Sequence, residues 1–333
     1  MPLSKIQTAE MLDTPNLGRR NLIINGDMRI AQRGTSFASP TNGDYTVDRF
    51  KVYTVNDGDE TLSQSTDVPA GKGFLYSLKI DVTTADTSMA AGQYLTVDQM
   101  IEGQNLTHLH WGSSSAKPIT VSFWVKSTLT GTYCYSIRNN AQDRSYVEDF
   151  TVNAANTWEK KTFTIQGEQT GTWLTTNGIG QIHQLSVAMG STFIGSAGWQ
   201  SNVNVVSTSN QVNLMNSTSN EFYITGWQVE VGETATPFEH RSYGEELALC
   251  QRYYYQVNNV AGGNVAYYHT YNDTTKMVSV YHPVTMRSIP LATVTGNVGT
   301  EYRSHAGHFQ MFYGSTNHNT TLNLDTMFFN SEI

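Results

Sequence analysis

The sequence contains little charge and little cysteine. Charged residues make up 14% of the 333 positions, and the formal net charge is −8 at pH 7. Because no basic stripe is available to pair with phosphates, we expect no nucleic-acid partner. The two cysteines, Cys134 and Cys250, are too few for a disulfide framework and lack the spacing of a zinc site. We expect both to be buried thiols that behave as small apolar side chains.

Long apolar runs are also missing. No stretch approaches the about 18 apolar residues of a membrane span, and the N-terminus has no basic segment followed by an apolar core. We therefore expect a protein made without a secretion signal and not inserted into a membrane. Polar uncharged residues and 18 tyrosines occupy much of the chain instead. Such a surface favours hydrogen bonds over ion pairs, which is typical of β-rich extracellular or virion proteins that contact sugars.

Familiar catalytic motifs are absent. The sequence contains no Gly-X-Ser-X-Gly, P-loop or dinucleotide fingerprint, and Gly178-Ile179-Gly180 is too short a match to count. Paired carboxylates for glycoside cleavage leave no local mark in a sequence, so a glycan-cleaving enzyme stays an alternative. Acids are sparse in the predicted strands, however. We expect no enzymatic activity, no catalytic residue and no cofactor.

Apolar and polar residues alternate along most of the chain, at the two-residue period of a strand with one buried face. The clearest case is 117–127, where Val121, Phe123 and Val125 are expected to face the core. Similar runs recur and are separated by turn clusters such as 69–73. Short strands that recur in this way indicate an all-β sandwich.

The pattern changes after residue 231. Gly232 and Pro237 end a strand pattern, and apolar residues then recur three or four positions apart, as on one face of a helix. Ser242 and Glu245 predict an N-cap with a capping box. A lone helix this short is marginal in water, so its stripe must pack against a sandwich edge or against other copies. The stripe consists of Tyr243, Leu247, Cys250 and Tyr254.

Five segments have distinctive amino-acid sequences. They are GRRNLIINGDM at 18–28, VDRF at 47–50, GWQVEVG at 226–232, ATPFEHRSYGEEL at 235–247 and CQRYY at 250–254. The sequences of these segments resemble those of tail-fibre and related virion proteins of tailed bacteriophages that carry a carbohydrate-binding-module-like jelly roll. The resemblance extends discontinuously from residue 18 to 290, and it implies a homotrimer.

The fold class that follows is all-β, with a jelly-roll β-sandwich followed by a short helix and a small C-terminal β-domain. We expect an extended N-terminal attachment arm at 1–20 and the jelly roll at 21–241. The linking helix is expected at 242–256, and the C-terminal β-domain at 257–333. The resemblance raises the expectation that the arm binds other virion proteins.

Three tryptophans are the candidate glycan-binding residues. Trp111, Trp173 and Trp199 lie beside small polar residues in predicted loops, where aromatic rings can stack on sugar faces. The alternative is that they cap the sandwich core, and the sequence does not decide between the two.

We predict no metal site, although three features were candidates. His108 and His110 would share one face of a strand, and His305 and His308 form a looser pair. The Asn-Gly-Asp at 25–27 corresponds to a stretch that often lies near a structural calcium in the resembling modules, but the aromatic residue and Glu that commonly follow there are replaced by Met and Arg. The neighbouring Asp-Arg at 48–49 is expected to be a structural ion pair.

These observations predict a non-enzymatic virion component, a trimeric tail fibre or adhesin that binds a host-surface glycan. Three weak sites held in one trimer bind far more tightly than one. The stripe Tyr243, Leu247, Cys250 and Tyr254 is the candidate oligomer interface. The alternative is a head fibre, capsid decoration or connector protein with a purely structural role.

Overall fold

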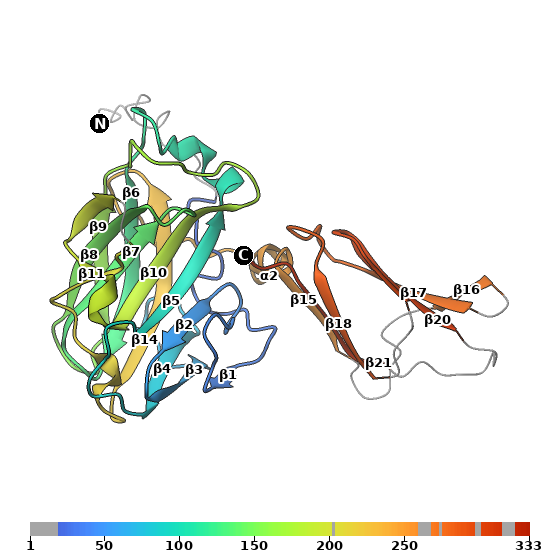
Figure 1. Ribbon diagram of the computed structural model, residues 1–333, viewed down its shortest axis with the longest axis horizontal. Helices are drawn as coiled ribbons and strands as arrows, with labels where there is room; N and C mark the ends of the chain where they lie inside the picture. The colour runs from blue at the N-terminus through green and yellow to red at the C-terminus, as the bar shows by residue number, and fades with distance from the viewer. Residues whose placement is uncertain (1–18, 202–203, 259–267, 273–274, 297–300, 315–323) are drawn as a thin grey trace, which may run out of the picture.

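The computed structural model describes residues 19–201, 204–258, 268–272, 275–296, 301–314 and 324–333 (Figure 1). It confirms the predicted fold class, a β-sandwich followed by one short helix and small C-terminal sheets. The predicted attachment arm at 1–20 lies outside the described residues except for Arg19 and Arg20. No helix in these ranges is long and apolar enough to cross a membrane.

Two antiparallel six-stranded sheets form the sandwich. The first has the order β1 (Ser36–Ala38), β3 (Asp59–Ser65), β4 (Ser77–Thr84), β14 (Glu221–Val231), β6 (Ile119–Ser127), β9 (Glu159–Ile165). The second has the order β12 (Gly198–Ser201), β8 (Arg144–Val152), β7 (Gly131–Arg138), β10 (Ile179–Met189), β5 (Tyr94–Glu102), β2 (Lys51–Val55). The last long strand, β14, therefore lies inside its sheet, between β4 and β6.

The core lies between the two sheets, as the alternating pattern requires. Val121, Phe123 and Val125 of β6 are fully buried, as predicted. Trp227 of β14 is also fully buried, and its ring centroid lies 5.6 Å from those of Phe50 and Tyr135. These large side chains connect strands from both sheets, so the sandwich has one continuous core.

The outer face of the second sheet is covered by its own chain. A segment with η3 (Ser191–Phe193), β11 (Ile194–Gly195) and β13 (Ser207–Thr208) crosses it. There the Ser186 hydroxyl donates to the Val206 carbonyl at 3.1 Å, and Cys134, Val147 and Val205 form a small apolar cluster. Cys134 and Cys250 are both buried thiols, as predicted, and burial raises the pKa of Cys134 to about 11.

The predicted helix is α2 (Tyr243–Gln251). Its N-cap is Ser242, whose hydroxyl accepts a hydrogen bond from the Glu245 backbone N–H at 3.2 Å, which confirms the predicted N-cap. The predicted capping box is incomplete, because the Glu245 side chain pairs with Arg19 instead of the Ser242 backbone. Beyond it, one sheet has the order β15 (Tyr254–Asn258), β21 (Leu324–Asn330), β18 (Leu291–Gly296), and the other β16 (Tyr268–Asn272), β17 (Thr275–Tyr281), β20 (His308–Gly314), β19 (Glu301–Ser304). The described core between them consists of Val280, Met286, Phe309, Met311, Met327 and Phe329.

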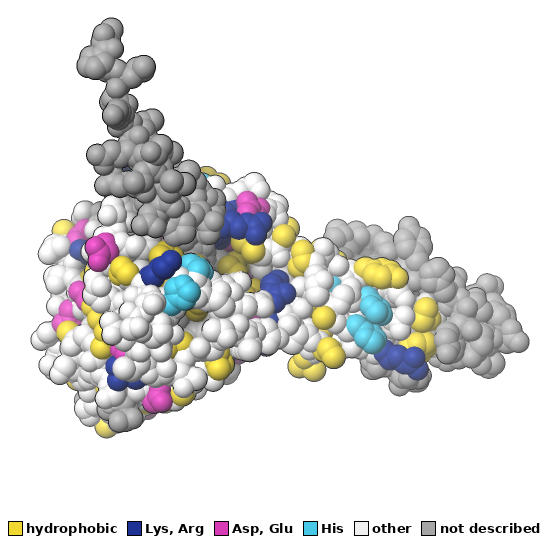
Figure 2. Space-filling view, turned by 90° about the horizontal axis from the view of Figure 1, so that it is seen from above, with side chains coloured by type: hydrophobic (Ala, Val, Ile, Leu, Met, Phe, Trp, Pro, Cys, Tyr) yellow, Lys and Arg dark blue, Asp and Glu magenta, His cyan; other side chains and the backbone are white. Residues whose placement is uncertain are grey.

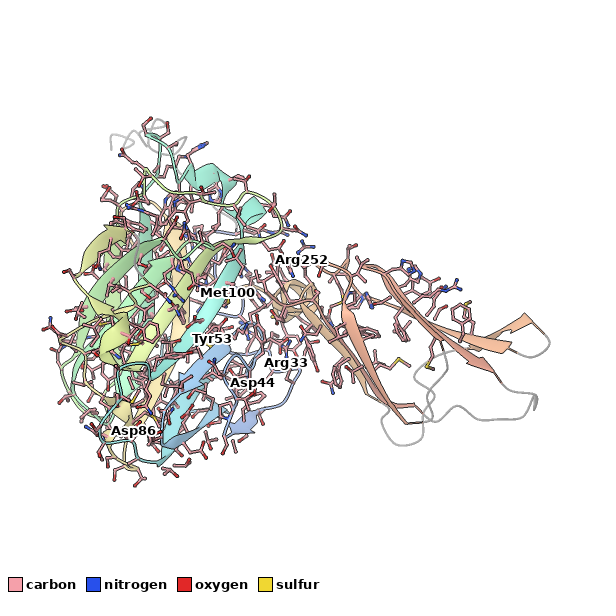
Figure 3. The ribbon with its side chains drawn as sticks, in the orientation of Figure 1. Arg33, Asp44, Tyr53, Asp86, Met100 and Arg252 are labelled. Atoms are coloured by element: carbon pink, nitrogen blue, oxygen red, sulfur yellow. The ribbon has the colours of Figure 1, made fainter. Side chains whose placement is uncertain are left out.

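Both ends of the C-terminal domain attach to the sandwich. At its start, the Arg252 guanidinium binds both carboxylate oxygens of Glu102 at 2.8 and 2.9 Å, and the Tyr253 hydroxyl donates to the same carboxylate at 2.6 Å. At its end, the Glu332 carboxylate pairs with the buried Arg49 guanidinium, which lies 3.4 Å from the centre of the Tyr253 ring. Figure 3 shows Arg33 and Arg252 at this boundary.

The predicted ion pair within Asp48-Arg49 is not what the structure shows. Arg49 pairs with Glu332, and Asp48 instead accepts hydrogen bonds from the Gln32 backbone and side chain. Arg33 lies 4.0 Å from Asp48 and 3.2 Å from Glu332. The roles are structural as expected, but the partners come from elsewhere in the chain.

Candidate functional site

The structure brings the three candidate tryptophans together in one cluster. Trp111 follows η2 (Thr107–Leu109), and Trp173 lies between β9 and β10. Trp199 lies in the edge strand β12 rather than in the predicted loop. Their ring centroids are 4.8, 5.5 and 6.0 Å apart, and all three pairs meet edge to face.

Each indole of this tryptophan cluster, Trp111, Trp173 and Trp199, has its N–H bound within the chain. The acceptors are backbone carbonyls of Lys117 at 2.8 Å, Thr170 at 3.0 Å and Gln166 at 2.9 Å, respectively. All three rings are half-buried against the sandwich core. The bound N–H groups therefore fix the orientation of the three indoles and tie them to the neighbouring loops.

A partly buried ion pair, Arg144–Glu168, supports the loop between β9 and β10 that carries Trp173. The Arg144 guanidinium donates to the Glu168 carboxylate at 2.7 Å, and the Thr170 backbone and hydroxyl bind the same side chain. Burial would raise the pKa of Glu168, but these hydrogen bonds and the charge of Arg144 lower it, so the carboxyl stays ionised. The hollow beside Trp111 and Trp173 has a volume of about 30 Å³. Ligand sites usually enclose about 300–1,000 Å³.

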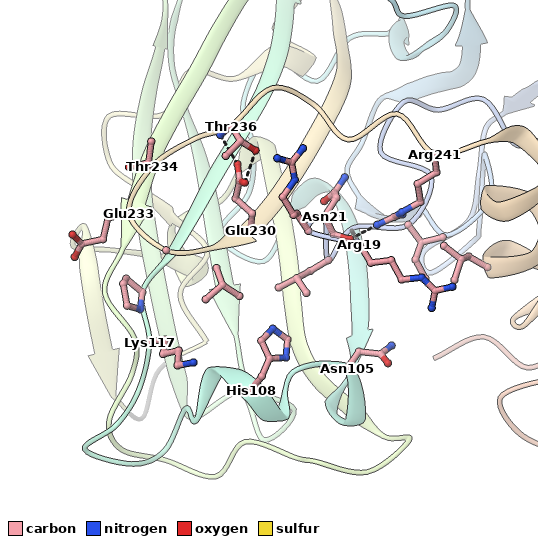
Figure 4. A pocket seen from close by; sticks show the side chains of 17 residues that line it. Arg19, Asn21, Asn105, His108, Lys117, Glu230, Glu233, Thr234, Thr236 and Arg241 are labelled. Atoms are coloured by element: carbon pink, nitrogen blue, oxygen red, sulfur yellow. Dashed lines mark hydrogen bonds between the residues drawn. The ribbon is translucent and has the colours of Figure 1, made fainter. Parts of the chain in front are cut away.

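A larger groove lies beside the loop 103–118 (Figure 4). Its volume is about 780 Å³, and it is bounded by segments 19–24, 105–118 and 230–236. The loop bends sharply at η1 (Gly103–Asn105), where a side chain on Gly103 would lie 1.9 Å from the Leu174 carbonyl oxygen. Only glycine fits this close approach. The loop 103–118 thus separates the groove from the tryptophan cluster.

One wall of the groove carries an acid whose oxygens are already bound. Glu230 accepts hydrogen bonds from the Thr236 backbone N–H at 2.8 Å, the Thr236 hydroxyl at 2.6 Å and the Gln228 amide at 2.9 Å. Figure 4 shows this carboxylate turned toward Thr236. Glu230 is 3% exposed, so it offers a ligand little contact.

The cations along the groove divide into two kinds. Two are paired with acids: the Arg241 guanidinium lies 3.1 Å from Glu239 and 3.2 Å from Glu246, and Arg19 lies 3.5 Å from Glu245. Lys117 has no acid partner among the described residues, and the Arg20 side chain makes one long hydrogen bond, from Nη2 to the Pro237 carbonyl at 3.3 Å. Arg241 fixes the wall, whereas Lys117 and Arg20 keep free hydrogen-bond donors.

The histidine pairs are arranged differently from the prediction. His108 lies in the 3-10 helix η2, and His110 follows it in a left-handed conformation with φ 54°, so no strand places them on one face. His108 lines the large groove, whereas His110 borders the small hollow. Burial, followed by the charges of Lys117 and His110, lowers the pKa of His108, which makes its imidazole neutral at pH 7.

Histidines also gather on the C-terminal domain, on the face shown in Figure 2. The rings of His305 and His308 stack with centroids 4.5 Å apart.

Near the first strand, Asn25 binds the Ile30 and Asp48 backbone, and Asp27 pairs with Arg29. Within the described ranges, no three His, Cys, Asp or Glu side chains come together as metal ligands would.

The predicted stripe is divided between two elements. Tyr243, Leu247 and Cys250 lie in α2, whereas Tyr254 is the first residue of β15, so the helix ends five residues before the predicted end at 256. Cys250 is fully buried and Tyr254 is 6% exposed, and both contact the chain itself. Leu247 is half-buried, whereas Tyr243 is 59% exposed. The outward part of the stripe therefore consists of Tyr243 and part of Leu247, and their role as an oligomer interface stays a prediction.

No sequence pattern indicates Lys117 or Arg20 as site residues. The groove forms from three segments that are far apart in the sequence, and a lone Lys or Arg in a loop has no local signal of function. A buried polar group on the outer face of β5 was also missed. There Asp98 is fully buried and accepts hydrogen bonds from the Thr96 hydroxyl at 2.7 Å and from the Gln184 amide.

No protein-family model matches this chain, and no curated protein sequence matches it. Similar folds occur among solved structures. The enzymatically active domain of tailspike protein 4 of bacteriophage CBA120 matches at 13% identity with a TM-score of 0.33, and the match covers 59% of this chain and 21% of that one.

Two carbohydrate-binding modules match over nearly their whole length. A CBM4 structure matches at 18% identity with a TM-score of 0.30, covering 62% of this chain and 98% of that one. The family 11 module from Clostridium thermocellum, in complex with a β-1,3-1,4-mixed-linked tetrasaccharide, matches at 11% identity with a TM-score of 0.30 and the same coverage. These likenesses carry no ligand over to this chain.

Proposed function

We propose that this chain is a non-enzymatic virion component of a tailed phage, a trimeric tail fibre or adhesin that binds a host-surface glycan. The binding region is the end of the sandwich around the loop 103–118. The observation that supports binding is the groove of about 780 Å³ on one side of this loop, with the tryptophan cluster on the other. The sequence resemblance of the segments at 18–28 and 226–254 to phage virion proteins supports the phage origin.

This end of the molecule has the chemistry that sugars require. Sugar hydroxyls bind to polar side chains such as Asn105 and Thr234, which line the groove, and the C–H faces of sugars stack on the faces of aromatic rings. Three copies in one particle multiply a weak interaction. The residues before Arg19 would attach the protein to other virion proteins.

The test of binding uses the full-length protein on immobilised host-surface polysaccharides. We expect saturable binding that Trp173→Ala weakens by roughly three- to tenfold, because one aromatic contact is lost. Trp158→Ala is the matched control. Trp158 is also half-buried, and its indole N–H donates to Asp67 at 3.0 Å. It differs in position, because it lies beside the first sheet, near Tyr223. Equal binding by both variants would show that the tryptophan cluster does not contribute to glycan binding.

A purely structural role as a head fibre, capsid decoration or connector is the second candidate. It is favoured by the three indole N–H groups, which all bind backbone carbonyls as in a cap over the core. No saturable binding to any host polysaccharide would support this role instead. Light scattering tests the trimer, whose expected mass is three times the 37.0 kDa of one chain. New reducing ends after incubation with polysaccharide would contradict the non-enzymatic role.

A further inference from the structure

We infer that the groove bounded by segments 19–24, 105–118 and 230–236 binds a negatively charged sugar unit, through a carboxylate or a phosphate. This inference rests on the proposed function, because it takes the ligand to be a glycan. It adds the chemical class of the ligand and the residues that select it. Arg20 and Lys117 would bind the anionic group, and Asn105 and His108 would bind neighbouring hydroxyls.

The first step concerns donors that the fold does not use. A lysine ammonium has three donors and an arginine guanidinium has five. Within the described chain, Lys117 has no acid partner, and the Arg20 side chain has one contact, at 3.3 Å. In a protein with net charge −8, two such cations along one groove attract an anion and not a cation.

The second step concerns the acids nearby. Glu230 is buried and bound by Thr236 and Gln228, and Glu239 and Glu246 are occupied by Arg241. Glu233 is exposed at the rim and accepts a long contact from Gln166 at 3.4 Å. No acid of the described groove wall therefore pairs with Lys117 or with the Arg20 side chain.

The third step concerns the neutral side chains beside the cations. His108 and Lys117 project from the same wall (Figure 4), and Asn105 lies farther along it. The lowered pKa of His108 leaves its imidazole neutral, able to donate from one nitrogen and accept at the other. The amide of Asn105 has no hydrogen-bond partner in the described chain. This combination suits a sugar ring that carries one anionic group among several hydroxyls.

The experiment compares charged and neutral sugars of matched size on the full-length protein by titration calorimetry. The probes are trigalacturonate against galactotriose, and mannose 6-phosphate against mannose. We expect an anionic probe to bind about tenfold or more tightly than its neutral match, since a hydrogen bond to a charged group contributes about 1.5–3 kcal/mol. Preference for the carboxylate or the phosphate probe identifies which anion is recognised.

Variants assign the preference to the groove. Lys117→Met and Arg20→Met keep the length of the stem but remove the charge, and each should reduce anionic binding by about three- to tenfold without changing neutral binding. Lys160→Met, at an exposed position on β9, is the control and should bind as the wild type does. Raising the salt from 50 to 300 mM should weaken only the anionic probes.

The outcomes separate the inference from the proposed function. Equal binding of charged and neutral probes, or an anionic preference that survives in both Lys117→Met and Arg20→Met, overturns the inference and leaves glycan binding intact. No binding of these probes or of any host polysaccharide overturns both. Circular dichroism of each variant verifies that its fold is unchanged.

Discussion

The sandwich and the C-terminal domain are both built of antiparallel strands, but different interactions stabilise them. The sandwich buries a continuous apolar core around side chains such as Phe123 and Trp227, which are fully buried. The described core of the C-terminal domain is small, and large apolar side chains remain on its surface. Tyr281 is 76% exposed, Ile289 67% and Leu291 74%.

This difference shows where the C-terminal domain obtains its support. Small domains bury a low fraction of their surface and gain little from their own cores. Here Arg252, at the end of α2 just before the domain, and Glu332, next to the C-terminal residue, are bound by the sandwich residues Glu102 and Arg49. We infer that the sandwich is stable by itself and that the C-terminal domain depends on this junction.

The largest effect is expected where the junction is broken. Glu332→Gln removes the charge that balances Arg49, whose side chain is 1% exposed. Burial alone would lower the pKa of Arg49, and the Glu332 carboxylate reverses this, so its pKa is raised and the charge persists. Leaving a buried charge unpaired costs about 3–5 kcal/mol. Hydrogen exchange should show faster opening of β15 and β21 in the variant.

The control is Glu233→Gln, which removes an exposed carboxylate at the groove rim. It should leave exchange in β15 and β21 unchanged. The comparison between the two regions fails if Glu332→Gln speeds exchange in β6 and β14 as much as in β15 and β21, because the sandwich would then depend on the junction too.

An intermediate effect is expected inside the sandwich, at Asp98. Burial raises the pKa of this carboxyl to about 7, although Arg138 and hydrogen bonds from Thr96 and Gln184 lower it. The folded value lies above the unfolded value of about 3.9, so the folded state binds the proton more tightly. The stability that this group contributes is complete below about pH 4 and is lost as the pH rises through 7.

Asp98→Asn should remove this dependence. Between pH 5 and pH 7 the wild type should lose about 2 kcal/mol of unfolding free energy through Asp98 that the variant retains. Urea unfolding at both pH values measures the difference, with Asp57→Asn, an exposed position, as the control. Parallel pH curves for wild type and Asp98→Asn would contradict the prediction.

The local features of this fold follow from short-range patterns. The alternation in 117–127 identifies β6 and its inward face, and the Ser242 and Glu245 spacing identifies the start of α2. Both patterns depend on residues that lie close together in the sequence. The sandwich class follows because the strand pattern recurs throughout the first two thirds of the chain.

Long-range features leave no such pattern. Arg49 and Glu332 are 283 positions apart, and neither has a neighbour in sequence that indicates the pair. The predicted strand at His108 and His110 was wrong because Leu106 and Leu109 both turn into the core, three positions apart, which a 3-10 turn permits and a strand does not. The groove likewise needs the positions of three distant segments, which only the fold supplies.

The smallest effect on the single chain is expected at Tyr243, whose side chain is 59% exposed. Tyr243→Glu should change the unfolding free energy of the isolated chain by less than about 0.5 kcal/mol, as is usual at exposed positions. In a trimer with α2 near the axis, three added carboxylates would repel one another, so light scattering should show dissociation. Tyr281→Glu places the same charge on the C-terminal domain. Dissociation by Tyr281→Glu alone would move the interface to the domain with the exposed apolar surface, where association would add the burial that its small core lacks.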